Sequence, residues 1–229
     1  MTSLAILIPA RYNSTRYPGK PLCMLDGVPM IKRVYDACIA SKIPTYVLTD
    51  DMRIAEVIPT RHSWVDEVDE YANGTERCAG AVKHCPLLSE YTEFINVQGD
   101  MPDVDVATIQ QVGWHLKHHS VTTAFTEMPK EKQDDPNTVK MVRSGDRALW
   151  FGRGMTGYGD WHLGIYGYRR DALEKYSTLE VTQEENIEQL EQLRWLKNGW
   201  QIGCLSVQYN GVEINAPEDV DLWHKINSQ

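Results

Sequence analysis

Three cationic side chains lie within ten residues of one another near the N-terminus, on a segment rich in turn-forming residues. Arg11, Arg16 and Lys20 belong to the run PARYNSTRYPGKPL at residues 9–22. Loop amides and cationic side chains together can bind a polyphosphate. The run is not a Walker loop, because the pattern GxxxxGK[ST] is absent. The alternative is an exposed basic loop without a ligand, and the residue types alone favour neither interpretation.

A carboxylate follows the short apolar run Phe94–Val97 in the segment NVQGD. Ligands of open α/β sheets bind at the carboxyl ends of the strands, and Asp100 stands at such an end. A carboxylate there can hold a Mg²⁺ ion that bridges phosphate oxygens. The alternative is that Gly99 and Asp100 simply turn the chain before Pro102.

Two further segments have polar residues in suggestive positions. Asn73 and Gly74 permit a tight backbone approach before a helix that Thr75 can cap, although a plain turn and cap is the favoured interpretation. In the segment HLGIYGYR, His162 and Tyr166 share one face of an extended strand. That face could bind a hydroxylated ligand, but a half-buried strand explains it equally well.

Three histidines, His115, His118 and His119, have helical spacing that could hold a metal. The sequence shows no acidic or cysteine partner nearby, so an exposed polar face is favoured. No GxSxG elbow occurs, and none of the five cysteines has the setting of a nucleophile or forms a CxxC pair. A covalent hydrolase, a disulfide framework and a zinc-cysteine site are therefore not indicated.

The elements that must position these residues follow from hydrophobic periodicity. In the first half, short apolar runs alternate with helical patterns, which predicts a mostly parallel sheet with helices on both faces. The expected strands are Leu4–Ile8, Tyr46–Leu48, Phe94–Val97 and Val121–Phe125, and the expected helices are Met30–Ile39, Asp51–Val57, Thr75–His84 and Val104–His118. After residue 130, the expected strands Thr138–Val142, Ala148–Phe151, His162–Tyr168 and Gln201–Val207 lack a helix between each pair. A mixed second half with an antiparallel part is therefore predicted.

One long helix is predicted in the second half, over Glu184–Asn198. Thr182 and Glu185 form a capping box, and Gly199 marks the stop. The predicted core stripe consists of Ile187, Leu190, Leu193 or the nearby Trp195, and Leu196. Glu191 and Gln192 lie off this stripe, which is typical of a solvated face.

Composition limits the possible partners. The 229 residues carry 23 basic and 32 acidic side chains, a net charge of −9, which argues against a general nucleic-acid binder. The first 50 residues nevertheless hold six basic against three acidic side chains, which suits a small anionic ligand. No apolar run reaches 18 residues, and the N-terminal run lacks the basic flank of a signal peptide. We expect a single-domain cytoplasmic protein with no membrane or nucleic-acid partner.

Taken in order, these motifs resemble the 3-deoxy-manno-octulosonate (Kdo) cytidylyltransferases, also called CMP-Kdo synthetases, of lipopolysaccharide biosynthesis. The segments that carry the resemblance are IPARYNSTRYPGKPL, NGTER, NVQGD, HLGIYGYR, IEQLEQLRWLKNG and NAPED. The resemblance implies an α/β nucleotide-diphospho-sugar transferase fold, Rossmann-like, with a nucleotide-binding half over about residues 1–130. The remaining residues, about 131–229, would form a small antiparallel sugar-binding and dimerisation half. It further implies a Mg²⁺-dependent homodimer that couples CTP to the anomeric hydroxyl of Kdo, or of a relative such as 8-amino-Kdo, and releases pyrophosphate.

Site residues carry over from the family position by position. The implied nucleotide-binding residues are Ala10, Arg11, Arg16, Lys20, Asn73, Gly74, Thr75 and Gln98. The implied sugar-binding residues are Gln98, Arg153, His162, Tyr166, Glu191 and Gln192. The implied metal ligands are Asp100 and Asn215, and Arg11, Lys20 and Asp100 are the implied catalytic residues.

This sequence departs from the family pattern at several of these places. Asn215 stands where the family has an aspartate, Met101 where it has a glutamate, and the segment between Arg153 and His162 is shorter. These departures leave two alternatives open: transfer of CMP to another acidic sugar or an activated alditol, and CTP binding without catalysis.

Overall fold

A single mixed sheet runs through both halves of the computed structural model, which describes residues 3–14, 17–66 and 70–227. Within these ranges the sheet has nine strands in the order β5-β4-β1-β6-β10-β7-β11-β9-β8. The strands are β1 (Leu4–Ala10), β4 (Thr45–Thr49), β5 (Ser63–Val65), β6 (Glu93–Asn96), β7 (Val121–Thr126), β8 (Lys140–Ser144), β9 (Arg147–Gly152), β10 (Asp160–Arg169) and β11 (Ile202–Ser206). A separate hairpin pairs β2 (Met24–Leu25) with β3 (Val28–Pro29).

The first half of the sheet is parallel, as the strand and helix alternation predicts. β1 pairs in parallel with β4 on one side and with β6 on the other. Residues Ala5–Ile8 are wholly buried, because both faces of this strand are covered by helices. The carboxyl ends of β1 and β6 therefore open at the same edge of the sheet, directly before the basic loop and before Asp100.

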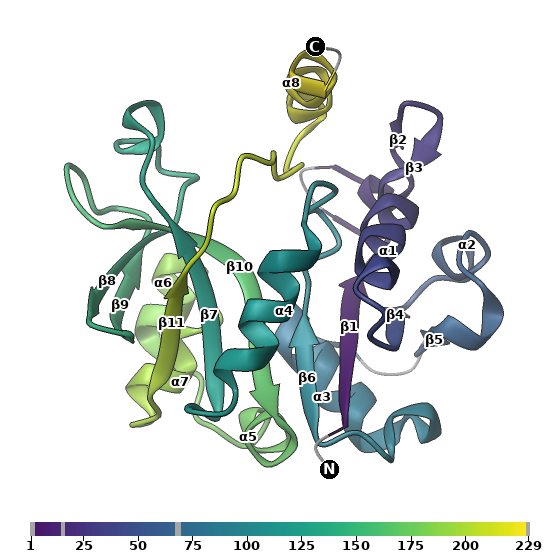
Figure 1. Cartoon of the computed structure of the whole chain (residues 1–229), viewed down its shortest axis with the longest axis horizontal. Coiled ribbons are helices and arrows are strands. Elements are labelled where there is room, and N and C mark those ends of the chain that lie inside the picture. Colours follow the sequence, from purple (N-terminus) through teal and green to yellow (C-terminus); the bar gives the residue numbers. More distant parts are fainter. Residues whose placement is uncertain (1–2, 15–16, 67–69, 228–229) are drawn as a thin grey trace.

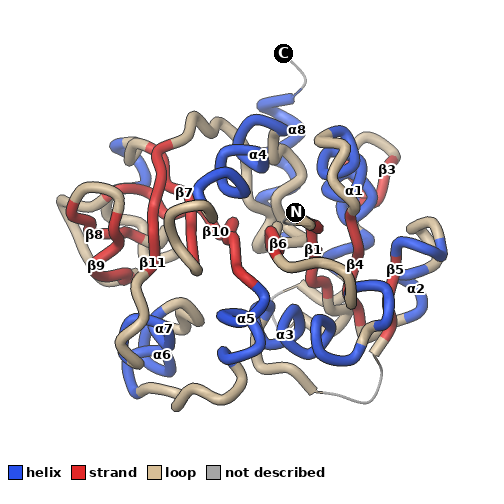
Figure 2. Tube along the Cα trace, turned by 60° about the horizontal axis from the view of Figure 1, so that its bottom comes forward, coloured by secondary structure: helices blue, strands red, loops and turns tan. Residues whose placement is uncertain are grey.

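Helices cover both faces of this sheet. Helices α1 (Met30–Ala40) and α4 (Val106–His115) lie on one face, and α3 (Gly74–His84) and α5 (Arg170–Tyr176) lie on the other (Figures 1 and 2). Each layer has its own hydrophobic core of buried aliphatic and aromatic residues. The remaining helices are α2 (Met52–Ala55), α6 (Gln183–Glu188), α7 (Leu193–Lys197) and α8 (Pro217–Asn227).

The second half introduces the antiparallel part that its sequence predicts. β10 runs antiparallel to both β6 and β7, and β8 and β9 form an antiparallel hairpin beside β11. The register of β10 against β7 shifts between Leu163 and Tyr166. The shift adds two residues to β10, so the alternation of side chains is preserved. His162 and Tyr166 consequently share a face, with ring centroids 5.5 Å apart.

The single helix predicted over Glu184–Asn198 is wrong. Thr182 does cap the start and Gly199, at a φ of 81°, does end it, but the segment breaks at Gln189, whose φ is 54°. The reason is tertiary: the backbone carbonyl of Glu188 accepts a hydrogen bond from Arg153 Nε, and the Glu188 carboxylate accepts one from the Arg153 N–H. Ile187 is consequently 69% exposed and does not belong to the core.

The predicted exposed face for the histidine cluster is also wrong at His115, which is 9% exposed. The turn between β8 and β9 brings an acidic partner, Asp146, to the cluster from outside the local sequence. No helix among the described residues has both the length and the apolar character that a membrane crossing needs.

Candidate active site

The basic loop after β1 is held by a partly buried ion pair. The backbone N–H of Tyr12 donates to Asp50 Oδ1 at 3.2 Å, and Asp50 Oδ2 pairs with the guanidinium of Arg77 at 3.1 Å. The loop also closes on itself, since the N–H of Gly19 donates to the carbonyl of Tyr12. Arg11 projects into the cavity beyond this anchored loop, and it has no ion pair with any residue that the structure describes.

Lys20 and Asp100 meet across the end of the sheet. Lys20 Nζ donates to Asp100 Oδ2 at 2.8 Å, with side-chain exposures of 16% and 26%. The two residues come from the loop after β1 and the loop after β6, which are adjacent parallel strands. The basic loop and the carboxylate predicted separately from the sequence therefore form one polar centre.

The start of α3 presents a polar helix N-terminus to the same centre. Asn73, and not Thr75 as predicted, caps this helix by accepting a hydrogen bond from the Glu76 N–H. A Cβ atom on Gly74 would lie 3.2 Å from Pro9 Cγ and 3.3 Å from Gln98 Oε1, so this position favours glycine. Thr75 is 1% exposed and lies beneath the cavity, where its hydroxyl hydrogen-bonds with Tyr168.

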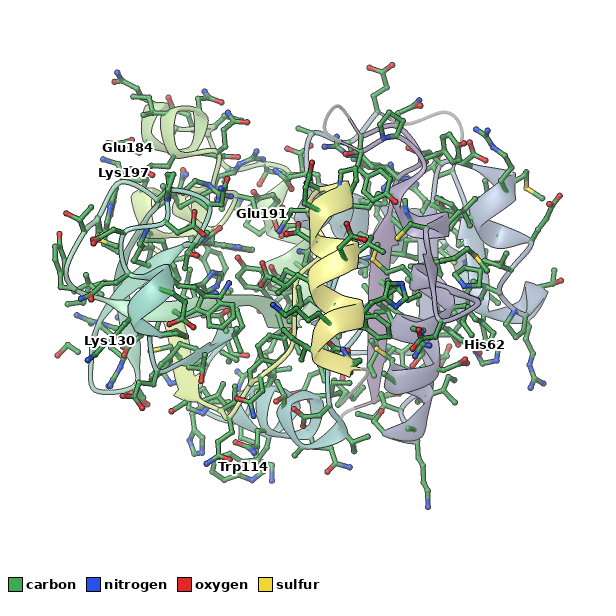
Figure 3. The ribbon with its side chains drawn as sticks, turned by 90° about the horizontal axis from the view of Figure 1, so that it is seen from above. His62, Trp114, Lys130, Glu184, Glu191 and Lys197 are labelled. Carbon is green, nitrogen blue, oxygen red and sulfur yellow. The ribbon has the colours of Figure 1, made fainter. Side chains whose placement is uncertain are left out.

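Glu191 joins the two halves of the site. Its Oε2 accepts a hydrogen bond from the Thr75 N–H at 3.0 Å, and its Oε1 lies 3.5 Å from Gln98 Nε2. The break between α6 and α7 places Glu191 near the middle of the molecule, whereas Glu184 and Lys197 lie at its periphery (Figure 3). Burial raises the pKa of Glu191, and the hydrogen bond from Thr75 opposes that shift.

His162 is a buried, neutral imidazole with a defined tautomer. Burial, and then the charge of Arg153, lower its pKa to about 3. Thr123 Oγ1 lies 2.9 Å from His162 Nε2 and donates its only proton to the carbonyl of Ile165 at 2.8 Å. This donor assignment places the proton of His162 on Nε2, which donates to Thr123, and leaves Nδ1 as an acceptor.

Arg153 ties three segments together at the sugar side predicted from the sequence. Its Nη1 donates to the carbonyl of Asn137 at 2.7 Å, and its Nε donates to the carbonyl of Glu188 at 3.2 Å. The carbonyl of Arg153 in turn accepts a hydrogen bond from the buried Lys140 at 3.0 Å. The guanidinium is therefore fixed at the cavity wall.

Oxygen donors suited to Mg²⁺ gather where the C-terminal segment meets the loop after β6. The Ile214 N–H donates to the carbonyl of Asp100 at 3.0 Å, and Asp219 accepts hydrogen bonds from the Asn215 N–H at 2.7 Å and from the Ala216 N–H. Asp100, Glu213 and Asn215 all line the cavity. Carboxylate and amide oxygens are the donors that this hard cation prefers, so the residues present fit it.

One cavity of about 800 Å³ collects most of the residues singled out from the sequence. Those that line it are Ala10, Arg11, Lys20, Asn73, Gly74, Gln98, Asp100, Arg153, His162, Tyr166, Glu191, Gln192 and Asn215. Thr75 lies behind the wall, and Arg16 falls outside the described residues. A volume of this size accommodates a nucleotide or another drug-sized ligand.

Asn137, Glu188 and Glu213 are among the lining residues that the sequence analysis did not single out. Burial, and then Asp100, raise the pKa of Glu213 to about 7. Glu213 precedes Asn215 by two positions, so a period-two pattern before the motif NAPED could have indicated it. The backbone carbonyls of Asn137 and Glu188 accept hydrogen bonds from Arg153, which positions both residues at the cavity. No local sequence pattern predicts contacts between residues so far apart.

A mixed sheet of this order, with a basic loop after β1 and a polar cavity at the strand ends, is typical of nucleotide-binding α/β proteins. Comparison with solved structures confirms the nucleotide-diphospho-sugar transferase fold. CMP:2-keto-3-deoxy-manno-octonic acid synthetase complexed with CTP matches with a TM-score of 0.90 at 29% identity, over 100% of this chain and 99% of that one. The 4-diphosphocytidyl-2C-methyl-D-erythritol synthase of Anaerococcus prevotii, 11% identical with a TM-score of 0.66, shares the fold alone.

Sequence comparison is more specific. A family model described as cytidylyltransferase matches residues 5–202. The 8-amino-3,8-dideoxy-manno-octulosonate cytidylyltransferase of Shewanella woodyi is 36% identical over 235 residues, covering 95% of this chain and 96% of that protein. Its Shewanella baltica counterpart is 37% identical with the same coverage. The chain belongs to the cytidylyltransferase family, as its motifs indicate.

Proposed function

We propose that this protein transfers CMP from CTP to the anomeric hydroxyl of a 3-deoxy-2-ulosonic acid, either Kdo or its 8-amino derivative, and releases pyrophosphate. The observation that carries the proposal is the bridge at Glu191. This carboxylate contacts the N-terminus of α3 on the nucleotide side and lies beside Gln98, while Arg153, His162 and Tyr166 line the same cavity. One cavity of about 800 Å³ therefore offers polar side chains to both proposed substrates.

The reaction is a displacement at the α-phosphorus of CTP. The sugar oxygen forms a new bond to phosphorus, the bond from phosphorus to the bridging oxygen of pyrophosphate breaks, and the sugar hydroxyl loses its proton. Such a reaction needs positioned reactants and stabilised charge, and no protein nucleophile. Arg11 and Lys20 are placed to offset the charge that develops on pyrophosphate.

Magnesium is the proposed cofactor, held by Asp100 and Asn215 with Glu213 beside them. When bound, the cation would polarise phosphate oxygens and favour the ionised sugar hydroxyl. A hydrogen bond within the chain holds the two segments that carry these ligands together. Ile214 is hydrogen-bonded to Asp100, so the C-terminal segment and the loop after β6 keep a fixed spacing.

The sugar acid is proposed to bind between Arg153 and the neutral His162. The Arg153 guanidinium suits the carboxylate of the acceptor, because charge-assisted hydrogen bonds of this kind are strong. Gln192 is 3% exposed, and its Nε2 has no hydrogen-bond partner among the described residues, so it can donate to a sugar hydroxyl. Family membership further supports a homodimer, which light scattering would test.

Pyrophosphate release tests this function. The protein is supplied with Mg²⁺, with Kdo or 8-amino-Kdo, and with CTP, UTP, ATP, GTP or dTTP in turn. Release with CTP alone supports the proposal, and the ratio of rates for the two sugars identifies the acceptor. Calorimetric binding of CTP without release for either sugar would instead favour a nucleotide-binding protein without this activity.

A further inference from the structure

A second cluster of potential ligands lies at the opposite end of the sheet from the cavity. His115 ends α4, His119 precedes β7, and Asp146 lies in the turn between β8 and β9. The cavity opens at the carboxyl ends of β1 and β6. β7 runs in the same direction as β6, because β10 is antiparallel to both. The start of β7 is therefore remote from the reaction proposed above.

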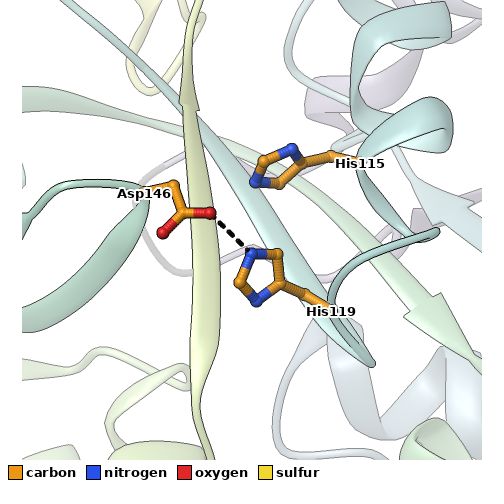
Figure 4. Close-up of side chains that lie close together, drawn as sticks. All are labelled: His115, His119 and Asp146. Carbon is orange, nitrogen blue, oxygen red and sulfur yellow. Dashed lines mark hydrogen bonds and ion pairs between the residues drawn. The ribbon is translucent and has the colours of Figure 1, made fainter.

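The three side chains converge. His119 Nε2 lies 3.1 Å from Asp146 Oδ2, and the His115 and His119 rings lie 4.9 Å apart. One ligand atom from each residue lies within 4.8 Å of the other two. Figure 4 shows a ring nitrogen of each histidine pointing toward the carboxylate.

An unpartnered buried nitrogen is the independent sign of a ligand. His115 is 9% exposed, and its Nε2 is buried without a hydrogen-bond partner among the residues that the structure describes. Buried polar atoms normally have a partner, because leaving one unsatisfied costs stability.

The other two ligands are held in place by β11. A Cβ atom on Gly203 would lie 2.4 Å from His119 Cγ and Cδ2, so only glycine admits the imidazole at this position. The backbone carbonyl of Asp146 accepts a hydrogen bond from the Cys204 N–H at 2.7 Å. Adjacent residues of one strand thus fix both partners of His115.

We propose that His115, His119 and Asp146 bind one Zn²⁺ ion, with water as the fourth ligand. Two imidazoles and a carboxylate suit this cation, and tetrahedral bonds of about 2.0–2.1 Å imply ligand separations of about 3.3 Å. The Asp146 side chain is 65% exposed, so its carboxylate is free to move inward to reach that geometry. The bound ion links the β8–β9 hairpin to the junction of α4 and β7 and thereby stabilises the fold.

Spectroscopic titration tests the site directly. The chelator-stripped protein, in excess Mg²⁺ to fill hard oxygen sites, is titrated with Co²⁺ while visible absorption is followed, and Zn²⁺ then displaces the Co²⁺. We expect one equivalent of tetrahedral Co²⁺. His119→Ala and Asp146→Ala should each weaken binding at least tenfold. His118→Ala is the matched control, because this adjacent histidine is exposed and lies outside the cluster.

Two further measurements separate this ion from one at the active site and from nonspecific binding. Asp100→Asn should leave the Co²⁺ spectrum and the stoichiometry unchanged. Zn²⁺ should raise the thermal midpoint of the wild type and of His118→Ala but not that of His119→Ala. The proposal is overturned by the absence of tetrahedral Co²⁺, or by equal affinity in the wild type and His119→Ala, which would mark an adventitious ion only.

Discussion

The carboxylate of Glu191 accepts a hydrogen bond from the backbone N–H of Thr75 at 3.0 Å, although 116 residues separate them in the chain. Thr75 lies in the first turn of α3, where N–H groups have no partner within the helix and the dipole favours a negative charge. The backbone carbonyl of Glu191 also accepts a hydrogen bond from Tyr176 Oη at 3.0 Å. Glu191 therefore fixes the segment between α6 and α7 against the N-terminus of α3 and the end of α5.

Replacing Glu191 by glutamine should impair turnover more than stability. The amide keeps the shape but removes the charge and brings a donor toward the Thr75 N–H. Misplacing a bound substrate by about 1 Å can cost about a hundredfold in rate, so we expect a loss of about ten- to a hundredfold in kcat/KM. Glu184→Gln is the matched control, because Glu184 pairs with Lys197 at the surface. Equal kinetics for the two variants would contradict the role of Glu191.

Lys20→Met should lower kcat for pyrophosphate release about 10²–10³-fold, the usual effect of removing one preorganised group that stabilises developing charge. The variant also leaves Asp100 without its ion-pair partner, so CTP binding in the absence of Mg²⁺ should weaken. Lys83→Met, in the exposed last turn of α3, is the control. Steady-state kinetics and calorimetry measure both effects, and an unchanged kcat would remove Lys20 from the catalytic set.

Hydrophobic periodicity predicts the strands of the sheet because it depends only on residues that are neighbours in the sequence. The apolar run at Leu4–Ile8 and the polar residues that follow it are contiguous in sequence, and parallel strands bring all such strand ends to one edge. The meeting of Lys20 and Asp100 follows from that rule, because they lie after the adjacent parallel strands β1 and β6. Their placement around one cavity is therefore accessible from sequence.

Long-range hydrogen bonds explain what the sequence does not reveal. The sequence over Glu184–Asn198 has a regular helical pattern. Arg153 nevertheless donates a hydrogen bond to the Glu188 carbonyl, and the helix breaks at Gln189. The break turns Glu191 from a residue of a solvated face into the bridge of the site. Asp146 likewise reaches His119 through strand pairing, so no spacing rule near the histidines includes it.

Thr123→Val should raise the KM for the sugar and leave that for CTP unchanged. Valine has nearly the same shape but cannot accept the His162 N–H or donate to the Ile165 carbonyl. Without the Thr123 hydroxyl, the imidazole can adopt the tautomer with the proton on Nδ1, so Nδ1 no longer accepts a hydrogen bond from the sugar that we propose to bind beside His162. Thr122→Val, on the neighbouring position of β7, is the control. A change in the KM for CTP of the same size would show a general distortion of the sheet.

The buried neutral His162 should make stability depend on pH below about 6.5. Its pKa is lowered from 6.5 to about 3, so between these values the unfolded chain binds a proton that the folded protein does not. Stability therefore falls as the pH falls through this window, by about 1.4 kcal/mol for each pH unit. In His162→Gln this contribution disappears, while the contributions of other groups, including His115, remain. Urea unfolding of both proteins at pH 7.5 and at pH 5 measures the difference. Parallel losses in the two proteins would show that the proton uptake lies elsewhere.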